Sequence, residues 1–134
     1  MKQIRIVKAL VVNEERLLLL KKISDEVSGH KGMWEAPGGK IEMDEDPKKG
    51  ILREVLEETG QKGVLIKVLE PWTWEKEDMR GEVDVFLISI SSKEVVLSGE
   101  HSKYKWILPR DMENMQNIIF KEKFIDYLRE ANLI

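Results

Sequence analysis

The start of the chain carries two apolar runs separated by a short polar segment. Residues 4–12 alternate loosely between apolar and polar positions, and residues 16–21 contain four consecutive leucines. Asn13, Glu14 and Glu15 lie between the two runs and are typical of a turn, so we predict a β-hairpin. Further strands are predicted at 64–69, 72–74, 82–90 and 104–108, with turns at Arg80-Gly81 and Ser98-Gly99.

Helical spacing of apolar residues occurs twice. We predict a helix over 47–59, because Asp46 can cap the free amides of its first turn and Pro47 is tolerated at the first helical position. Gly60 is predicted to end this helix. A second helix with one buried face is predicted over 121–131, from the apolar residues Phe120, Phe124, Ile125 and Leu128.

Strands outnumber helices in this pattern, which predicts an α+β fold with a mixed β-sheet and helices packed on it. The chain has 134 residues, 42% of them hydrophobic, and no repeat or low-complexity tract divides it. We therefore predict a single domain over residues 1–134. A mobile loop is predicted at 22–33, where Gly29 and Gly32 lie among polar side chains.

The composition excludes several classes of function. The absence of cysteine excludes disulfides, thiol catalysis and cysteine-based zinc sites, and it agrees with a reducing compartment. The apolar run 17–20 is too short for a membrane span, and basic residues interrupt the apolar residues before it, unlike a signal peptide. A pI near 5.5 argues against nucleic-acid binding. We expect a cytoplasmic monomer or homodimer without membrane or stable nucleic-acid partners.

Negative charge is concentrated in one part of the chain. Residues 35–58 contain eight acidic and four basic residues, a net charge of −4, whereas the rest of the chain sums to +1. At about 100° per residue, Glu54, Glu57 and Glu58 share one flank of the predicted helix. The neighbouring apolar stripe consists of Ile51, Leu52, Val55, Leu56 and Thr59.

Three carboxylates on one helix flank predict a metal site. Like charges held this close disfavour joint ionisation, and Mg²⁺ or Mn²⁺ would resolve the conflict because hard oxygen donors suit these ions. The alternative is a solvated acidic face in which Arg53 pairs with Glu57. The segment Pro37-Gly38-Gly39 favours the metal site, because glycine lets main-chain groups approach an ion or a phosphate closely.

The spacing from Gly39 onward resembles the signature of the Nudix hydrolases. Five residues separate Gly39 from Glu45, and seven more precede Arg53-Glu54-Val55-Leu56-Glu57-Glu58-Thr59-Gly60, which matches the family's REUXEEXG run. The resemblance covers residues 39–61 and departs from the family pattern at Gln61, where a bulky aliphatic residue is usual; this leaves the packing after the helix open. The segment 34–42 is similar to the MutT-type branch. The resemblance implies a Nudix-type α/β/α sandwich.

The resemblance also implies a reaction and its cofactor. Nudix enzymes hydrolyse a nucleoside diphosphate linked to another group, by attack of water on phosphorus with the help of Mg²⁺, for which Mn²⁺ can substitute. By similarity, metal is held by the carbonyl of Gly38 and by the side chains of Glu54, Glu57 and Glu58.

Other motif residues receive supporting roles from the same resemblance. Arg53 would orient the glutamates, Glu45 would brace the loop against the helix, and Gly39 and Gly60 would be structural. Two residues are alternatives for the general base: Glu54, and Glu100 in a segment from which many Nudix enzymes supply an additional glutamate. His101 is expected to be a structural or surface residue.

Aromatic residues and one lysine are candidate substrate contacts. Trp72 and Trp74 share one face of a predicted strand, where they either stack on a nucleotide base or pack within the sheet. Tyr104 lies in a segment that resembles the dinucleoside polyphosphate hydrolases and is a candidate base contact. Lys40 follows the glycines, where it either meets a phosphate or is solvated.

Three functional hypotheses result. The first is a Mg²⁺-dependent nucleotide pyrophosphohydrolase that converts a nucleoside triphosphate, including an oxidised or noncanonical one, to monophosphate and pyrophosphate. The second uses the same metal core to cleave dinucleoside polyphosphates or ADP-ribose. The third is a non-catalytic Nudix domain that binds nucleotide, against which the intact set of Glu54, Glu57 and Glu58 argues.

Overall fold

The computed structural model describes residues 1–23 and 30–134, so residues 24–29 of the predicted loop lie outside the described residues. The strands are β1 (Lys2–Asn13), β2 (Arg16–Lys22), β3 (Trp34–Glu35), β4 (Gly38–Ile41), β5 (Val64–Val68), β6 (Trp72–Lys76), β7 (Met79–Ser89) and β8 (His101–Ile107). The helices are α1 (Pro47–Thr59), the 3₁₀-helix η1 (Pro109–Asn114) and α2 (Lys121–Glu130).

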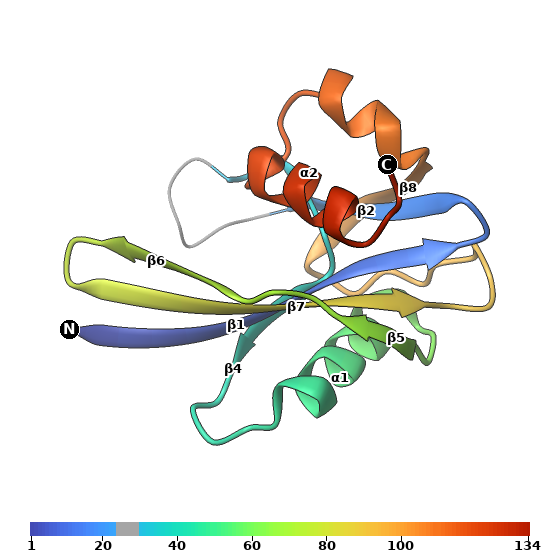
Figure 1. The fold of residues 1–134 in the computed structure, drawn as a ribbon. Coiled ribbons are helices and arrows are strands. Elements are labelled where there is room, and N and C mark those ends of the chain that lie inside the picture. The colour runs from blue at the N-terminus through green and yellow to red at the C-terminus, as the bar shows by residue number, and fades with distance from the viewer. Residues whose placement is uncertain (24–29) are drawn as a thin grey trace.

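Strand β1 organises the sheet by pairing with three neighbours. It runs parallel to β7 from Lys2 to Val12. On its other side it pairs antiparallel with β4 at Arg5 to Lys8 and with β2 only at its end. Strand β2 also pairs with β3 and β8, and β7 also pairs with β5 and β6. Helix α1 lies on one face of this mixed sheet and α2 on the other (Figure 1), which confirms the predicted fold class.

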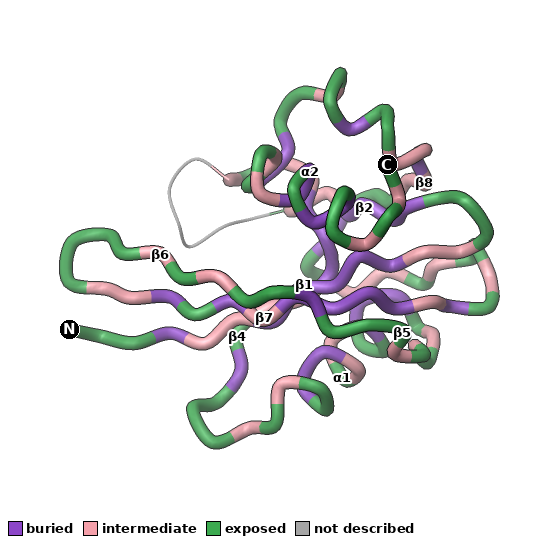
Figure 2. The backbone as a smooth tube through the Cα atoms, in the orientation of Figure 1, coloured by how far each residue is buried: buried purple, intermediate pink, exposed green. Residues whose placement is uncertain are grey.

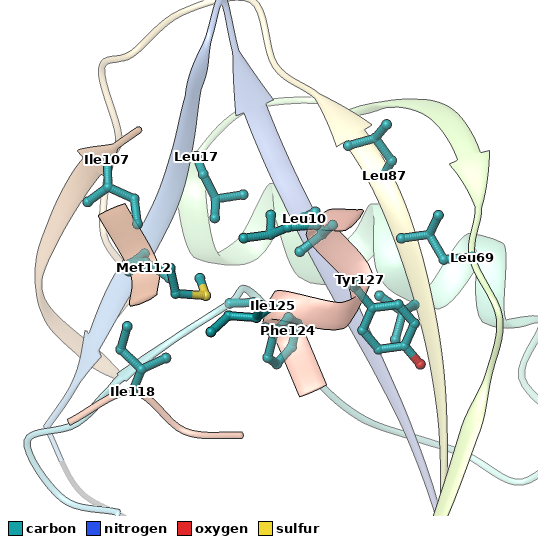
Figure 3. Close-up of a cluster of buried hydrophobic side chains, with 14 of the residues drawn as sticks. Leu10, Leu17, Leu69, Leu87, Ile107, Met112, Ile118, Phe124, Ile125 and Tyr127 are labelled. Carbon is teal, nitrogen blue, oxygen red and sulfur yellow. The ribbon is translucent and has the colours of Figure 1, made fainter. Parts of the chain in front are cut away.

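Most residues in the middle of β1, β2 and β7 are buried (Figure 2), and their apolar side chains form two separate core clusters. Alternate residues of β1, β2 and β7 point to opposite faces. One face packs against α2 and η1, where Leu10, Leu17 and Leu87 from the sheet meet side chains of the helical layer (Figure 3). The other face packs against Ile51 and Val55 of α1. The four consecutive leucines of β2 therefore serve two cores.

Helix α1 has the predicted ends but a rotated buried face. The Asp46 side chain accepts a hydrogen bond from the Lys48 amide, and Gly60 ends the helix in the left-handed conformation at φ 76°. Ile51, Val55 and Thr59 are buried as predicted. Leu56 is 44% exposed, however, and Glu58 is buried in its place. The predicted stripe was wrong at Leu56 because a polar partner, described below, draws Glu58 toward the sheet.

Two predictions outside α1 need correction, and two short strands were not predicted. The turn predicted at Arg80-Gly81 lies at Glu77-Asp78, and both predicted residues belong to β7. Gly81 is needed inside the strand because the Trp74 indole covers it, and a Cβ there would overlap the ring. Phe120 precedes α2, is 46% exposed and is not part of the buried face. Strands β3 and β4 were not predicted, because two and four residues are too few to show a pattern.

None of the helices in the described part of the chain is long and apolar enough to cross a membrane.

Candidate active site

The glycine-rich strand β4 lies directly against the carboxylates of α1. The Gly38 amide donates a hydrogen bond of 2.7 Å to Glu58 Oε1. A Cβ on Gly39 would lie 3.3 Å from Glu54 Oε1. Gly38 adopts φ 142°, and a Cβ there would overlap the Val7 carbonyl oxygen of β1. Glycine at position 38 therefore lets β4 approach β1 closely, and glycine at position 39 lets β4 approach the Glu54 carboxylate.

Arg53 connects the carboxylates to the loop before α1. Its guanidinium donates to Glu45 Oε2 at 3.2 Å, to Glu54 Oε1 at 3.3 Å and to Glu57 Oε1 at 3.1 Å. Glu45 in turn accepts the Glu42 amide at 3.2 Å. These contacts are those expected of a residue that orients Glu54 and Glu57 and of a glutamate that braces the loop. They also include the Arg53–Glu57 pair of the alternative interpretation.

The three helix glutamates have different environments. Glu58 is buried, and this burial raises its pKa from 4.5 to about 8, against the charge of Lys8 and the hydrogen bond from Gly38. Burial also raises the pKa of Glu54, and Arg53 opposes the effect. The Glu57 side chain is 54% exposed. The fold therefore does not produce a uniform acidic flank. Glu58 is buried, Glu54 is partly buried and Glu57 is exposed.

A buried chain of charged groups behind Glu58 was not predicted. Lys8 Nζ lies 2.8 Å from Glu35 Oε1, and Glu35 Oε2 lies 2.9 Å from His101 Nε2. The other ring nitrogen, His101 Nδ1, lies 3.5 Å from Glu58 Oε2. His101 was expected to be a structural or surface residue, and the structure places it in the interior and not on the surface. The available signal was Lys8, a charged residue between the apolar pairs Ile6-Val7 and Ala9-Leu10 of β1.

The charge of Glu35 is held by its partners. Burial alone would raise its pKa, but the Lys8 charge, the hydrogen bonds from His101 and Lys8 and the charge of Lys22 outweigh burial and lower it to about 2. Glu35 is therefore a carboxylate at neutral pH, and it accepts hydrogen bonds without donating any.

Glu100 is exposed and immediately precedes β8. Its charge contributes to the raised pKa of Glu54, so the two candidate bases lie near one another. Glu58, Glu100 and His101 each place one ligand atom within 4.8 Å of the others. Glu58 Oε2 and His101 Nδ1 are buried and lack a hydrogen-bond partner among the described residues. This donor set and its two unpaired atoms fit a divalent cation.

The candidate substrate contacts are distributed over both faces of the sheet. Trp72 and Trp74 pack against the core on the α2 side, and the Trp72 ring contacts Phe120 edge-on at 5.4 Å. Tyr104 pairs with Leu20, which faces α1, and is 38% exposed. Lys40 is exposed on β4. Two of these residues lie on strands that border the carboxylates. Tyr104 lies on β8, which also contains His101, and Lys40 lies on β4, which also contains Gly38 and Gly39.

Gln61, the departure from the family pattern, is held by hydrogen bonds. Its side-chain amide donates to the carbonyls of Ser92 at 2.8 Å and Glu94 at 2.6 Å, and its oxygen accepts the Ser92 amide at 3.1 Å. An aliphatic residue would make none of these bonds. The packing after α1 is therefore maintained by polar contacts in place of apolar ones.

The family of the chain follows from its match to known proteins. Residues 2–128 match the family model of the NUDIX domain. The chain therefore belongs to the Nudix family and is a hydrolase that acts on phosphorus-containing anhydrides.

Individual relatives share both sequence and fold with the chain. A MutT-like protein of Streptomyces ambofaciens is 32% identical over 126 residues, which cover 93% of this chain and 77% of that protein. The nucleoside triphosphatase NudI of Escherichia coli is 28% identical over 125 residues, covering 84% of this chain and 86% of NudI. A crystal structure of a MutT protein from Methanosarcina mazei Go1 superimposes with a TM-score of 0.82 at 32% identity, covering 97% of this chain and 96% of that one.

Proposed function

We propose that this protein is a Mg²⁺-dependent nucleotide pyrophosphohydrolase that converts a nucleoside triphosphate to a monophosphate and pyrophosphate. One observation carries the proposal: Arg53 gathers Glu45, Glu54 and Glu57 while the Gly38 amide anchors Glu58, so that a full set of oxygen donors borders one glycine-rich strand. The name of the relative NudI, a nucleoside triphosphatase, supports a nucleoside triphosphate as the substrate.

The chemistry requires few protein groups. Water attacks a phosphorus atom of the α–β anhydride, the bond from that phosphorus to the bridging oxygen breaks, and the water proton passes to a base. A bound divalent cation would neutralise charge on the phosphate oxygens and lower the pKa of the attacking water. We assign the cation to Gly38 O, Glu54, Glu57 and Glu58, with Mn²⁺ as a substitute for Mg²⁺.

The remaining residues position these groups. Arg53 holds Glu54 and Glu57 at fixed orientations through its hydrogen bonds, and Glu45 fixes Arg53 in turn. We keep two candidates for the general base. One is Glu54, whose pKa burial raises in the metal-free protein, and the other is the exposed Glu100. Lys40 and Tyr104 are proposed to contact the phosphates and the base, respectively.

A panel of substrates tests the proposal. Canonical, oxidised and other noncanonical nucleoside triphosphates, dinucleoside polyphosphates and ADP-ribose are incubated with the protein, with and without Mg²⁺, and the products are separated by chromatography. We expect monophosphate and pyrophosphate from a triphosphate, in the presence of the metal only. Preferential cleavage of ADP-ribose or of a dinucleoside polyphosphate would replace the substrate assignment. Tight nucleotide binding without turnover would indicate a non-catalytic domain.

Two variants distinguish the candidate bases. Glu54→Gln and Glu100→Gln are compared with the wild type by the pH dependence of kcat. The variant that lacks the base loses the rise of kcat with pH that reports ionisation of that base. Loss of a metal ligand instead raises the Mg²⁺ concentration needed for half-maximal activity. If both variants keep the wild-type profile and rate, neither residue is the base.

A further inference from the structure

Two buried polar atoms point at one another beside the site. Glu58 Oε2 and His101 Nδ1 are 3.5 Å apart, on side chains that are 3% and 1% exposed. The other Glu58 oxygen is occupied by the Gly38 amide. No hydrogen-bond partner for either atom is present among the residues that the structure describes. Leaving such a pair unsatisfied would be costly, so a proton or a cation must lie between the two atoms.

The contact between Glu35 and His101 Nε2 determines whether the other ring nitrogen, Nδ1, carries a hydrogen or a lone pair. Glu35 Oε2 lies 2.9 Å from Nε2, and the Lys8 ammonium, 2.8 Å from the other oxygen, keeps Glu35 a carboxylate. A carboxylate only accepts, so Nε2 must carry a hydrogen and donate it. In the neutral imidazole, Nδ1 is then unprotonated and directs its lone pair at Glu58. A histidine oriented by a carboxylate in this way is the usual arrangement of a metal-ligating histidine.

A third donor completes the group from the solvent side. Glu100 is the residue before His101 and is exposed, and one of its oxygens lies within 4.8 Å of both Glu58 and His101 ligand atoms. The group thus has two buried ligands and one exposed ligand, so an ion can enter from solvent past Glu100. It contains one nitrogen donor, which the oxygen set of Glu54 and Glu57 lacks.

We propose that Glu58, Glu100 and His101 Nδ1 form a mixed nitrogen–oxygen site for a divalent transition-metal ion such as Mn²⁺, Co²⁺ or Zn²⁺. The site rests on the proposed function only in sharing Glu58 with the assigned Mg²⁺ ligands. Imidazole nitrogen suits transition metals, whereas Mg²⁺ prefers oxygen ligands and retains its water. The site therefore selects transition metals over Mg²⁺ through His101, and Glu35 is a positioning residue that orients the ring.

The test uses Mn²⁺ alone as the probe, without nucleotide. Metal-free full-length protein is loaded with Mn²⁺ below one equivalent, and pulsed electron paramagnetic resonance measures coupling to a directly bound ¹⁴N nucleus. We expect this coupling in the wild type. The chain has two histidines, so His30→Gln is the matched control and should keep the coupling, while His101→Gln should lose it. The wild-type measurement stands even if His101→Gln fails to fold.

Affinities provide a second readout. Titration calorimetry should give a Mn²⁺ affinity at least about tenfold lower in His101→Gln than in wild type. In Glu35→Gln the Mn²⁺ affinity should fall by about 10- to 100-fold. The Mg²⁺ affinity should change little in either variant. An absence of ¹⁴N coupling in the wild type overturns the site, as does equal Mn²⁺ affinity in folded His101→Gln and wild type. If coupling is absent but Mg²⁺-dependent turnover of nucleotide persists, the mixed site fails and the proposed function stands; coupling without turnover gives the reverse result.

Discussion

The buried Glu58 carboxyl predicts that the metal-free protein loses stability as pH rises. Its pKa is raised from 4.5 to about 8, and each pKa unit corresponds to about 1.4 kcal/mol. Because the folded state holds a proton that the unfolded state releases, the free energy of unfolding falls across this range. The stabilisation is complete below pH 4.5 and is lost as pH rises through 8. The full loss is about 5 kcal/mol, and about 2 to 3 kcal/mol of it falls between pH 5.5 and 7.5.

Glu58→Gln separates this effect from other titrations. The glutamine oxygen can still accept the Gly38 amide, and its NH₂ group can donate to His101 Nδ1, so the variant imitates protonated Glu58. In EDTA, the variant should therefore gain stability relative to wild type as pH rises from 5.5 to 7.5. Both proteins retain every other titratable group, so the difference between their curves reports the Glu58 carboxyl together with its effect on the groups that contact it.

Urea unfolding monitored by fluorescence of the four tryptophans measures this difference. Saturating Mg²⁺ at pH 7.5 should stabilise the wild type more than Glu58→Gln, because the cation binds the ionised carboxylate that only the wild type contains. If the stability difference between wild type and Glu58→Gln in EDTA is the same at both pH values, the raised pKa of Glu58 is refuted.

Four other substitutions give distinct outcomes. Gly38→Ala should lower the free energy of unfolding by about 3 kcal/mol, because its Cβ overlaps the backbone of β1 at a positive φ. Gly39→Ala is the control for Gly38→Ala. It should lower the free energy of unfolding by less than about 1 kcal/mol, yet lower kcat about tenfold by displacing Glu54. Equal stability losses in the two variants would contradict this contrast. Glu35→Gln should destabilise by about 3 to 5 kcal/mol, since it leaves a buried lysine charge without its carboxylate, and an unchanged urea midpoint would exclude this. Glu57→Gln, exposed on α1, should leave the free energy of unfolding within about 0.5 kcal/mol of wild type but lower kcat about 100-fold or more. Near-normal turnover would remove Glu57 from the metal ligands.

Local signals were sufficient to predict the central helix. Asp46, Pro47 and Gly60 act on backbone groups within one turn, so the ends of α1 could be placed from the sequence and are confirmed. The angular positions of the glutamates were also available from the helical period. The burial of Glu58 in preference to Leu56 was not, because it depends on the Gly38 amide, 20 residues away in the chain.

Long-range polar contacts account for what the sequence did not reveal of the site. Glu35 is 27 residues from Lys8 and 66 from His101, and no periodicity connects these positions. Gly81 was misread for a related reason: glycine is a turn signal, but here it makes room for the indole of Trp74 on the neighbouring strand. Packing partners on other strands therefore decide features that a local pattern assigns wrongly.

The hydrogen bonds of Gln61 define how far α1 can slide along its own axis. Apolar contacts tolerate small translations of a helix, whereas the directional bonds to Ser92 and Glu94 hold one end of α1 at a single position. The Val96 amide adds a bond of 2.9 Å to the Thr59 carbonyl at the same end. The segment 92–96 that makes these bonds continues directly to Glu100. The same segment therefore fixes the position of the helix glutamates and of the exposed glutamate. A change of length between Glu94 and Glu100 would therefore shift one side of the site relative to the other without altering any of its side chains.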